Sequence, residues 1–272
     1  MNSFPPTGSR VLVIVAHADD PTLFCGGTIK AMSEQDCRIT ILRVTDDRFD
    51  SVDLDADATI RRNRSEFEQA AGLLGVSDLV DLDYHTDTLG DASELGLRER
   101  FIYHVRRIRP YAVISYDPYG AYGEDNQDHI RVAAAVDEMY WTAQFDKHHP
   151  EHFDEGLEPH GVFERWYFAR RLTEVTTPVD ISTTIEAKVE AVVAHETMMR
   201  NMVHQLRLQA RTAGLTVPDL ETAWESGDLR PIIDRVVRAG AASTGMRHGL
   251  GFAEEFRVVR FGGLGPLFGI GA

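Results

Sequence analysis

Five consecutive apolar residues at positions 11–15 (VLVIV) lead directly into a polar run that contains His17, Asp19 and Asp20. A short, bounded run of mostly β-branched residues predicts a buried central strand rather than a helix. In an open α/β sheet, ligands bind in the crevice outside the carboxyl ends of the strands. Packing gives little reason for an imidazole and two carboxylates at such a strand end, so we expect a metal and a reaction there.

Strand and helix patterns alternate along the first part of the chain. The predicted strands cover residues 11–15, 38–45, 79–82, 112–116 and 163–170, and the predicted helices cover residues 28–35, 58–75, 97–108, 130–144 and 185–206. Residues 145–160 have the composition of a loop. This alternation implies right-handed crossovers and a mainly parallel sheet with helices on both faces, which is a Rossmann-like α/β fold.

The 272 residues are long enough for a sizeable core, and we predict a single domain over residues 1–272. Residues 1–200 would form the core and residues 251–272 a final strand region. Between them, residues 201–250 show a weak, polar pattern with short helical pieces. We interpret this C-terminal elaboration as an insertion on the substrate side rather than as an independent domain.

The formal net charge of −15 argues against nucleic acid as a partner, because Lys and Arg hold phosphates. The charge is compatible with a cationic ligand, and it also simply favours solubility. Cys25 and Cys37 stand in no C-x-x-C arrangement, so neither a disulfide framework nor a Cys-type zinc site is indicated. No run approaches the ~20 apolar residues that span a bilayer, and no secretion signal is recognisable, so we predict a cytoplasmic protein without a membrane partner. Homo-oligomerisation stays open.

His17 and Asp20 are three residues apart, where the predicted strand turns into a helix. In such a tight turn both side chains can face one point, and a neutral imidazole and a carboxylate are good ligands for first-row metals. Asp20 before Pro21 is also an ordinary helix start, with Asp as the N-cap. Both interpretations of Asp20 stay open, and one carboxylate can serve both.

A second polar cluster, residues 119–129, follows the predicted strand 112–116 and ends on His129. Because loops after neighbouring parallel strands meet at one sheet edge, His129 could join His17 and Asp20 in a His/Asp/His set. Three protein ligands with an open position for water are typical of catalytic zinc. Two histidines and a carboxylate also suit an iron oxygenase, but those enzymes generally have jelly-roll folds, against which the α/β pattern counts.

The run AHADD followed by Gly26-Gly27-Thr28 resembles the A-H-P-D-D-E…G-G signature of the LmbE-like, or PIG-L, family of zinc-dependent de-N-acetylases. Four further segments are similar to motifs of that family and occur in the same order. They are Arg64-Ser65-Glu66 with Ala70-Ala71 and Leu74-Gly75, Asn126-Gln127-Asp128-His129 in place of H-P-D-H, the helix KVEAVVAH at residues 188–195, and Ala253-Glu254-Glu255-Phe256.

The resemblance implies an LmbE-like fold and roles for individual residues. His17, Asp20 and His129 correspond to the Zn²⁺ ligands, and Asp19 corresponds to the general base. The motif of Arg64 suggests that its side chain binds substrate. We assign Asp128 to orienting His129 or another side chain of the motif.

Two departures from the family pattern affect the expected chemistry. Pro21 stands where the family usually has Glu, and Asn126 replaces the first His of H-P-D-H. An Asn side chain can donate a hydrogen bond to an oxyanion, but it cannot act as an acid near pH 7. His195 is our candidate for the proton donor and protonated Asp19 is the alternative, while His195 could equally be a histidine bonded within the core.

The family implies a small-molecule substrate that carries an N-acetylglucosaminyl group. Chain length and the 201–250 elaboration suggest deacetylation of a teicoplanin-type glycopeptide pseudoaglycone in antibiotic biosynthesis. The alternative is the N-acetylglucosaminyl-inositol deacetylase of the mycothiol pathway. A different class, a non-catalytic homologue that binds metal and carbohydrate, is motivated by Asn126 and Pro21, although the presence of Asp19 argues against it.

Overall fold

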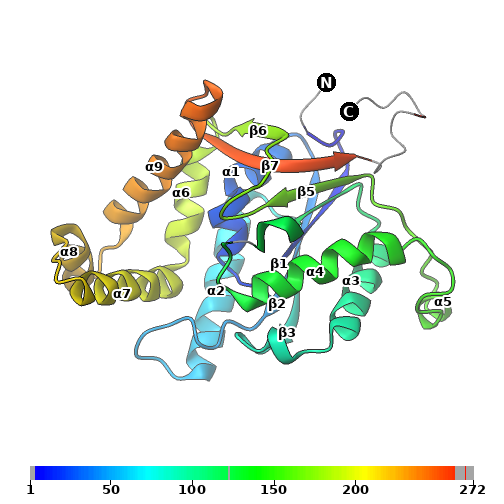
Figure 1. Ribbon diagram of the computed structural model, residues 1–272, viewed down its shortest axis with the longest axis horizontal. Helices are drawn as coiled ribbons and strands as arrows, with labels where there is room; N and C mark the ends of the chain where they lie inside the picture. Colours follow the sequence, from blue (N-terminus) through cyan, green and yellow to red (C-terminus); the bar gives the residue numbers. More distant parts are fainter. Residues whose placement is uncertain (1–3, 122, 261–266, 268–272) are drawn as a thin grey trace.

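A single seven-stranded sheet, in the order β3-β2-β1-β4-β5-β7-β6, forms the centre of the protein (Figure 1). The structure is a computed structural model that describes residues 4–121, 123–260 and 267. Neighbouring strands from β3 to β5 are parallel, and β7 runs antiparallel to β5 and to β6. This confirms the predicted mainly parallel α/β sheet. The strands are β1 (Arg10–Val15), β2 (Arg38–Thr45), β3 (Asp78–Tyr84), β4 (Ala112–Tyr116), β5 (Glu164–Phe168), β6 (Thr177–Asp180) and β7 (Ala253–Arg260).

Helices cover both faces of the sheet, as predicted. On one face α3 packs beside α4, and on the other α6 packs against both α1 and α2 (Figure 1). No helix in the described part of the chain is both long and apolar enough to cross a membrane. The α-helices are α1 (Asp20–Glu34), α2 (Ala56–Leu74), α3 (Glu94–Ile108), α4 (Gln127–Thr142), α5 (Glu151–Asp154), α6 (Ile185–Ala194), α7 (Glu196–Thr212), α8 (Pro218–Ser226) and α9 (Arg230–His248).

Strand β1 lies at the point where the strand order reverses, between β2 and β4. Its residues from Val11 to Val15 have no solvent exposure, which confirms the predicted buried central strand. The chain leaves β1 towards β2 on one side, and β4 continues the sheet on the other side. The segments that follow β1 and β4 therefore meet in the crevice where α/β sheets bind ligands.

The structure departs from the predicted elements at several places. Helix α1 begins at Asp20, eight residues before the helix expected over residues 28–35. The helix expected over residues 185–206 is two helices, α6 and α7, with His195 at the break between them. Strand β6 was not predicted, and the loop at 145–160 contains the short helix α5. Helices α8 and α9 occupy most of the weakly patterned 201–250 region. The final strand region includes β7, and residues 261–266 and 268–272 lie outside the described part.

Four of the motif residues contact one another away from the cavity at the end of β1: Gly27, Thr28, Lys188 and Glu254. Helix α1 is kinked at Cys25, which frees the backbone N–H groups of the next turn. The Glu254 carboxylate of β7 accepts from the N–H groups of Gly27 (3.0 Å) and Thr28 (2.8 Å). Its charge is balanced by the buried Lys188, whose Nζ lies 2.5 Å from Oε1. A Cβ at Gly27 would lie 2.7 Å from Ile181, so only glycine fits this crossing.

Candidate metal centre

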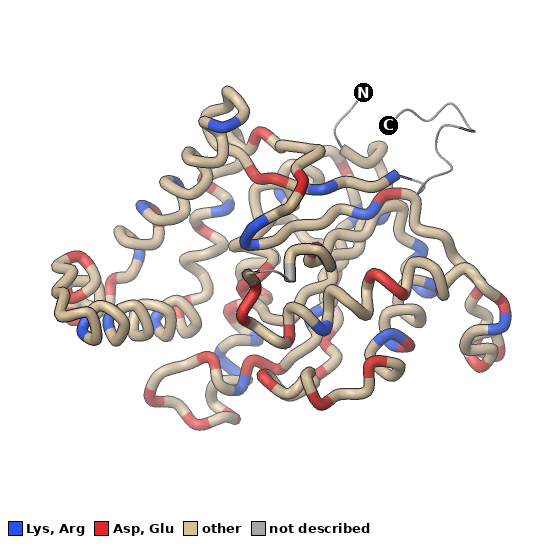
Figure 2. The backbone as a smooth tube through the Cα atoms, in the orientation of Figure 1, with Lys and Arg blue, Asp and Glu red and all other residues tan. Residues whose placement is uncertain are grey.

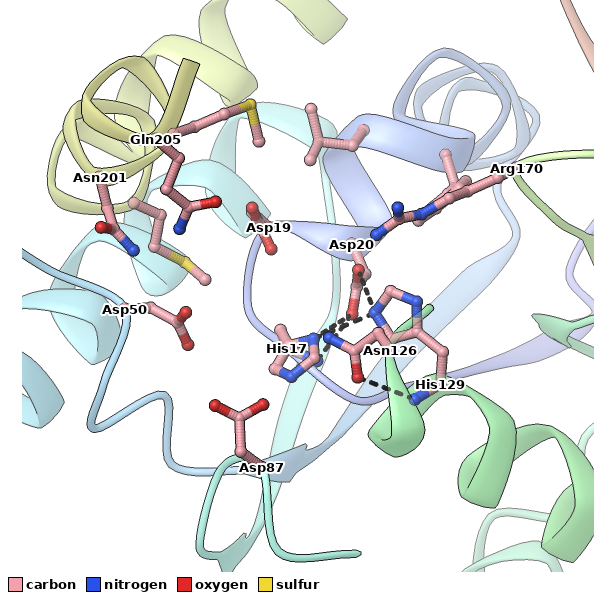
Figure 3. Close-up of a pocket in the computed structure, with 14 residues that line it drawn as sticks. His17, Asp19, Asp20, Asp50, Asp87, Asn126, His129, Arg170, Asn201 and Gln205 are labelled. Atoms are coloured by element: carbon pink, nitrogen blue, oxygen red, sulfur yellow. Dashed lines mark hydrogen bonds and ion pairs between the residues drawn. The ribbon is translucent and has the colours of Figure 1, made fainter. Parts of the chain in front are cut away.

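A cavity of about 400 Å³ opens at the ends of β1 and β4. His17 and Asp19 follow β1, Asp20 begins α1, and His129 lies in the first turn of α4 (Figure 3). The far wall comes from α7, which brings Asn201 and Gln205 over the same space (Figure 3). The remaining lining residues are Leu23, Phe24, Asp50, Asp87, Asn126, Arg170, Met198 and Met202.

His17, Asp20 and His129 bring three potential metal ligands together. Nδ1 of His17 lies 3.1 Å from Nε2 of His129. The two Asp20 oxygens lie 3.3 Å from these nitrogens, Oδ2 from His17 and Oδ1 from His129. The three side chains are buried, and the three ligand atoms lie within 4.8 Å of one another. Two imidazoles and one carboxylate at this spacing form a donor set that suits Zn²⁺, with the cavity side left open to a fourth ligand.

Asp128 fixes the orientation of His17. Its Oδ2 lies 3.4 Å from Nε2 of His17, so Nδ1 of that ring faces the ligand cluster. The same carboxylate is held by the backbone N–H groups of Asp87 (2.7 Å) and Leu89 (3.1 Å). A carboxylate on the outer nitrogen of a ligand histidine sets its tautomer and raises its basicity. Asp128 thus contacts His17, which is one of the two options that the sequence left open.

The Asp20 carboxylate does not cap α1, since the helix has no side-chain cap bond and its N-cap is Asp19. Instead, Oδ2 of Asp20 accepts from the backbone N–H of His17 at 2.7 Å and from the hydroxyl of Tyr116 at the end of β4. Burial and the nearby Asp20 charge raise the pKa of Tyr116 well above its ordinary value, so this phenol stays protonated and donates. The ring of Tyr116 also stacks on His129, with centroids 4.4 Å apart. Tyr116 was not recognised from the sequence, although it ends a predicted strand.

Asp19 lies beside the ligand cluster and lines the cavity, but it is not one of the three grouped ligands. Its backbone carbonyl begins helix α1 by accepting from Thr22 and Leu23, which turns the carboxylate towards the cavity (Figure 3). Burial, and then the charge of Asp20, raise the pKa of Asp19 to about 8. This placement suits a group that exchanges a proton with a molecule in the cavity.

Asn126 caps helix α4 with its side-chain oxygen and has a side-chain amide that can donate a hydrogen bond. Its Oδ1 caps α4 by accepting from the backbone N–H groups of Asp128 (2.8 Å) and His129 (3.4 Å). Among the described residues no acceptor pairs with its amide nitrogen, and the side chain lines the cavity (Figure 3). Asn126 can therefore hold the His129 turn and donate a hydrogen bond to a bound molecule at the same time.

His195 does not lie in the cavity lining, and its side chain is fully buried at the junction of α6 and α7. Burial lowers its pKa to about 3, so the imidazole is neutral at pH 7. A buried imidazole outside the cavity lining does not reach a molecule in the cavity, so the structure gives no support to His195 as the proton donor. The alternative from the sequence was a histidine bonded within the core. The side chain is buried there, but neither ring nitrogen has a hydrogen-bond partner among the described residues.

Arg64 also lies outside the cavity lining. It is an exposed residue of α2, and its guanidinium pairs with Asp81 (2.9 Å) and Asp83 (3.1 Å). These two carboxylates hold it at the end of β3, so the structure gives no support to a substrate contact. Two residues on, Glu66 caps α7 by accepting from the N–H and hydroxyl of Thr197.

Asp47 supports the loop that carries His17, Asp19 and Asp20, a role that no sequence motif indicates. Its Oδ2 lies 2.7 Å from the buried Arg43 and accepts from the backbone N–H of Ala18 at 3.3 Å. The residue has φ 55°, a left-handed conformation that Asp and Asn tolerate better than most residues. Asp47 therefore connects the end of β2 to the middle of the ligand loop.

Arg43 pairs with Asp47 and with Asp81, each at 2.7 Å. We expect Asp47→Asn to lower the free energy of unfolding by about 2 kcal/mol, because it leaves the buried Arg43 with one of its two carboxylate partners. Asn keeps the left-handed backbone, so the change isolates the ion pair. Asp53 has φ 64° but is exposed, and Asp53→Asn should cost less than about 0.5 kcal/mol. Urea denaturation of both variants measures the difference. Equal, small losses would contradict the supporting role of Asp47.

A second group of possible metal ligands, His149, Glu151 and His152, lies around α5. Both ring nitrogens of His152 already have partners, Glu99 at 2.8 Å and the guanidinium of Arg106 at 3.1 Å. A cation this close to the ring disfavours a bound dication. The residues of the first cavity are thus the better metal centre.

Acidic side chains dominate the surroundings of the cavity. Asp19, Asp20, Asp50 and Asp87 all line it, and Arg170 is the cationic side chain among the described lining residues. Figure 2 shows acidic residues along the loop between β2 and α2, whereas arginines recur along α9. Such a site disfavours anionic ligands and stabilises a cationic product.

Residues 12–140 match the family model described as GlcNAc-PI de-N-acetylase (PIG-L). The diacetylchitobiose deacetylase of Thermococcus kodakarensis is 28% identical over 200 residues, which are 72% of this chain and 73% of that protein. The 1D-myo-inositol 2-acetamido-2-deoxy-alpha-D-glucopyranoside deacetylase of Rhodococcus erythropolis is 25% identical over 245 residues, covering 71% and 82%.

Solved structures share the fold. The N,N'-diacetylchitobiose deacetylase from Pyrococcus horikoshii superposes with a TM-score of 0.74 at 24% identity and covers 95% of this chain and 88% of that one. A zinc-inhibited teicoplanin deacetylase superposes with a TM-score of 0.57 at 14% identity, covering 93% and 98%. At these identities the likeness shows the fold alone, and the teicoplanin enzyme is the more distant of the two.

Proposed function

We propose that this protein hydrolyses the N-acetyl group of an N-acetylglucosamine unit in a small glycoside, with Zn²⁺ as its metal. The match of residues 12–140 to the model of the PIG-L de-N-acetylases supports this proposal. The observation that carries the proposal is the convergence of His17, Asp20 and His129 on one cavity that Asp19 also lines. A metal binder without activity has no need of a buried carboxylate beside its ligands. The three donors would also suit iron, but the parallel sheet is not the jelly roll typical of iron oxygenases.

The chain's own residues can perform the proton transfers of amide hydrolysis. A Zn²⁺ ion held by His17, Asp20 and His129 would supply Lewis-acid polarisation of the acetamide carbonyl and of the attacking water. Asp19 would accept the proton of that water, and Asn126 would donate a hydrogen bond to the carbonyl oxygen as its negative charge develops.

The departing amine must gain a proton before it leaves the sugar. Asp19 lines the cavity, whereas His195 is buried outside its lining, and we propose that Asp19 returns the proton that it accepted. The lining carboxylates would then stabilise the ammonium product. One side chain would therefore serve as base and as acid in succession.

The relatives favour a small glycoside over a glycopeptide pseudoaglycone. Two relatives, at 28% and 25% identity, are named for diacetylchitobiose and for an inositol glycoside, whereas the teicoplanin deacetylase is 14% identical. We therefore rank the sequence-based alternative, the N-acetylglucosaminyl-inositol substrate, together with diacetylchitobiose, above the pseudoaglycone.

Release of acetate by the zinc-reconstituted protein tests this proposal. The panel comprises N-acetylglucosamine, N,N'-diacetylchitobiose, the N-acetylglucosaminyl-inositol and a teicoplanin-type pseudoaglycone. We expect equal amounts of acetate and free amine from one of the small glycosides. Its kcat/KM should exceed that of the pseudoaglycone by about tenfold or more, since contacts missing from a mismatched substrate cost at least ~1.4 kcal/mol. Metal-bound protein that releases acetate from none of them would contradict the activity.

A further inference from the structure

We infer that Glu124 is a positioning residue for His129 and that Arg170 holds it in place. The inference rests on the proposed metal site and adds a link from that site to the loop after β5. Glu124 belongs to the segment between β4 and α4 in which this sequence departs from the H-P-D-H pattern. No motif singled it out.

The geometry around His129 carries the inference. Nε2 of His129 lies 3.3 Å from Oδ1 of Asp20, inside the ligand cluster. The opposite nitrogen, Nδ1, is buried and has no aligned hydrogen-bond partner among the described residues, but Oε2 of Glu124 lies 3.2 Å away. With its proton on Nδ1 and directed at Glu124, the imidazole presents the lone pair of Nε2 to the metal.

The Glu124 carboxylate is itself fixed. Its Oε1 accepts from the backbone N–H groups of Asp125 (3.1 Å) and Asn126 (3.0 Å), and the guanidinium of Arg170 lies 3.4 Å away. Oε2 is thereby left to face His129. Arg170 follows β5 and lines the cavity (Figure 3), so the side chain that holds Glu124 also faces the substrate space.

This arrangement mirrors the one on the other ligand. Asp128 lies against the outer nitrogen of His17, and Glu124 lies against the outer nitrogen of His129. Each ligand histidine thus has its own carboxylate, Glu124 from the connection between β4 and α4 and Asp128 from the first turn of α4. Asp125 offers a matched comparison, because it pairs with the same Arg170 at 2.8 Å and no contact joins it to His129.

Zinc affinity, measured by competition with a chromophoric chelator, tests the inference. We expect Glu124→Leu to weaken Zn²⁺ binding about 10- to 100-fold, as loss of an outer carboxylate typically does. Glu124→Gln should lie between that variant and the parent protein, because its amide oxygen still accepts from Nδ1–H. Asp125→Asn should stay within about twofold, since an exposed pair contributes little.

Arg170→Gln should weaken zinc binding by a few fold in the parent protein. In the Glu124→Leu background it should cause no further loss, because both changes act through one contact.

The visible spectrum of the Co²⁺-substituted protein should change in Glu124→Leu and not in Asp125→Asn. This spectrum reports the geometry of the ligands rather than folding. Unchanged zinc affinity in Glu124→Leu, or an equal loss of affinity in Asp125→Asn, would overturn the inference. Zinc binding by the parent protein would still support the proposed metal site. A parent protein that binds no zinc would instead overturn the proposed function. If Glu124→Leu does not fold, the same comparison is made with Glu124→Gln.

Discussion

Purified His17→Ala should lose its zinc and with it nearly all deacetylase activity. The parent protein should carry about one zinc per chain, because two imidazoles and one carboxylate complete a three-ligand catalytic site. Removing one ligand leaves two, and the activity should fall by at least about a thousandfold because the Lewis acid is lost. Metal content by plasma mass spectrometry and acetate release give the two readouts.

The control for this change is His148→Ala, which removes an exposed histidine of the α4–α5 loop. It should retain full metal content and activity. Circular dichroism of both variants separates metal loss from unfolding. A folded His17→Ala protein that keeps one zinc per chain would remove His17 from the ligand set, and Asp20 and His129 would then need another partner.

The architecture could be predicted where the sequence pattern is local. The buried run of β1 and the alternation after it are set by side-chain periodicity, and both appear in the structure. The break between α6 and α7 has no such signal, because the apolar spacing continues through His195 and the residue lacks the marks of a helix stop. Strand β6 is four residues long, and it exists because β7 pairs with it from far along the chain.

In the candidate site too, the features set by local sequence pattern could be predicted and those set by long-range contacts could not. His17, Asp20 and His129 could be brought together from the sequence because each follows a predicted strand, and parallel strands share a carboxyl edge. Their supporting partners were not predictable, since those contacts depend on side-chain directions. Asp47 and Glu124 stand in polar loops where carboxylates are ordinary. Only the folded backbone places one under the Ala18 amide and the other beside His129.

The C-terminal elaboration contributes to the site through its first helix. Asn201, Met202 and Gln205 of α7 line the cavity opposite the ligand loop. Helices α8 and α9 pack against α7 and α6 and so support that wall from behind (Figure 1). The placement of residues 201–250 on the substrate side stays a prediction, and Asn201, Met202 and Gln205 are the described residues of that range that line the cavity.

Asp19→Asn should keep its zinc and lose about a thousandfold in kcat, within the range of a lost general base and acid. The amide is nearly isosteric with the carboxylate, but it can neither accept the proton of the attacking water nor return it to the amine. Because Asp19 is not one of the three grouped ligands, the metal content should stay at that of the parent protein.

Asp50→Asn provides the matched control for Asp19. Asp50 lines the same cavity and also has a buried carboxylate oxygen, but it lies apart from the ligand loop (Figure 3). If Asp19 acted only through its charge, the two substitutions would reduce kcat alike. If Asp19 carries the proton, kcat of Asp50→Asn should fall by less than about tenfold, as expected for a group that contributes only to the electrostatic field of the cavity. A comparable loss of kcat in both variants, with zinc retained, would contradict the role of Asp19 as general base and acid. The effect would then come from the negative charge of the cavity as a whole.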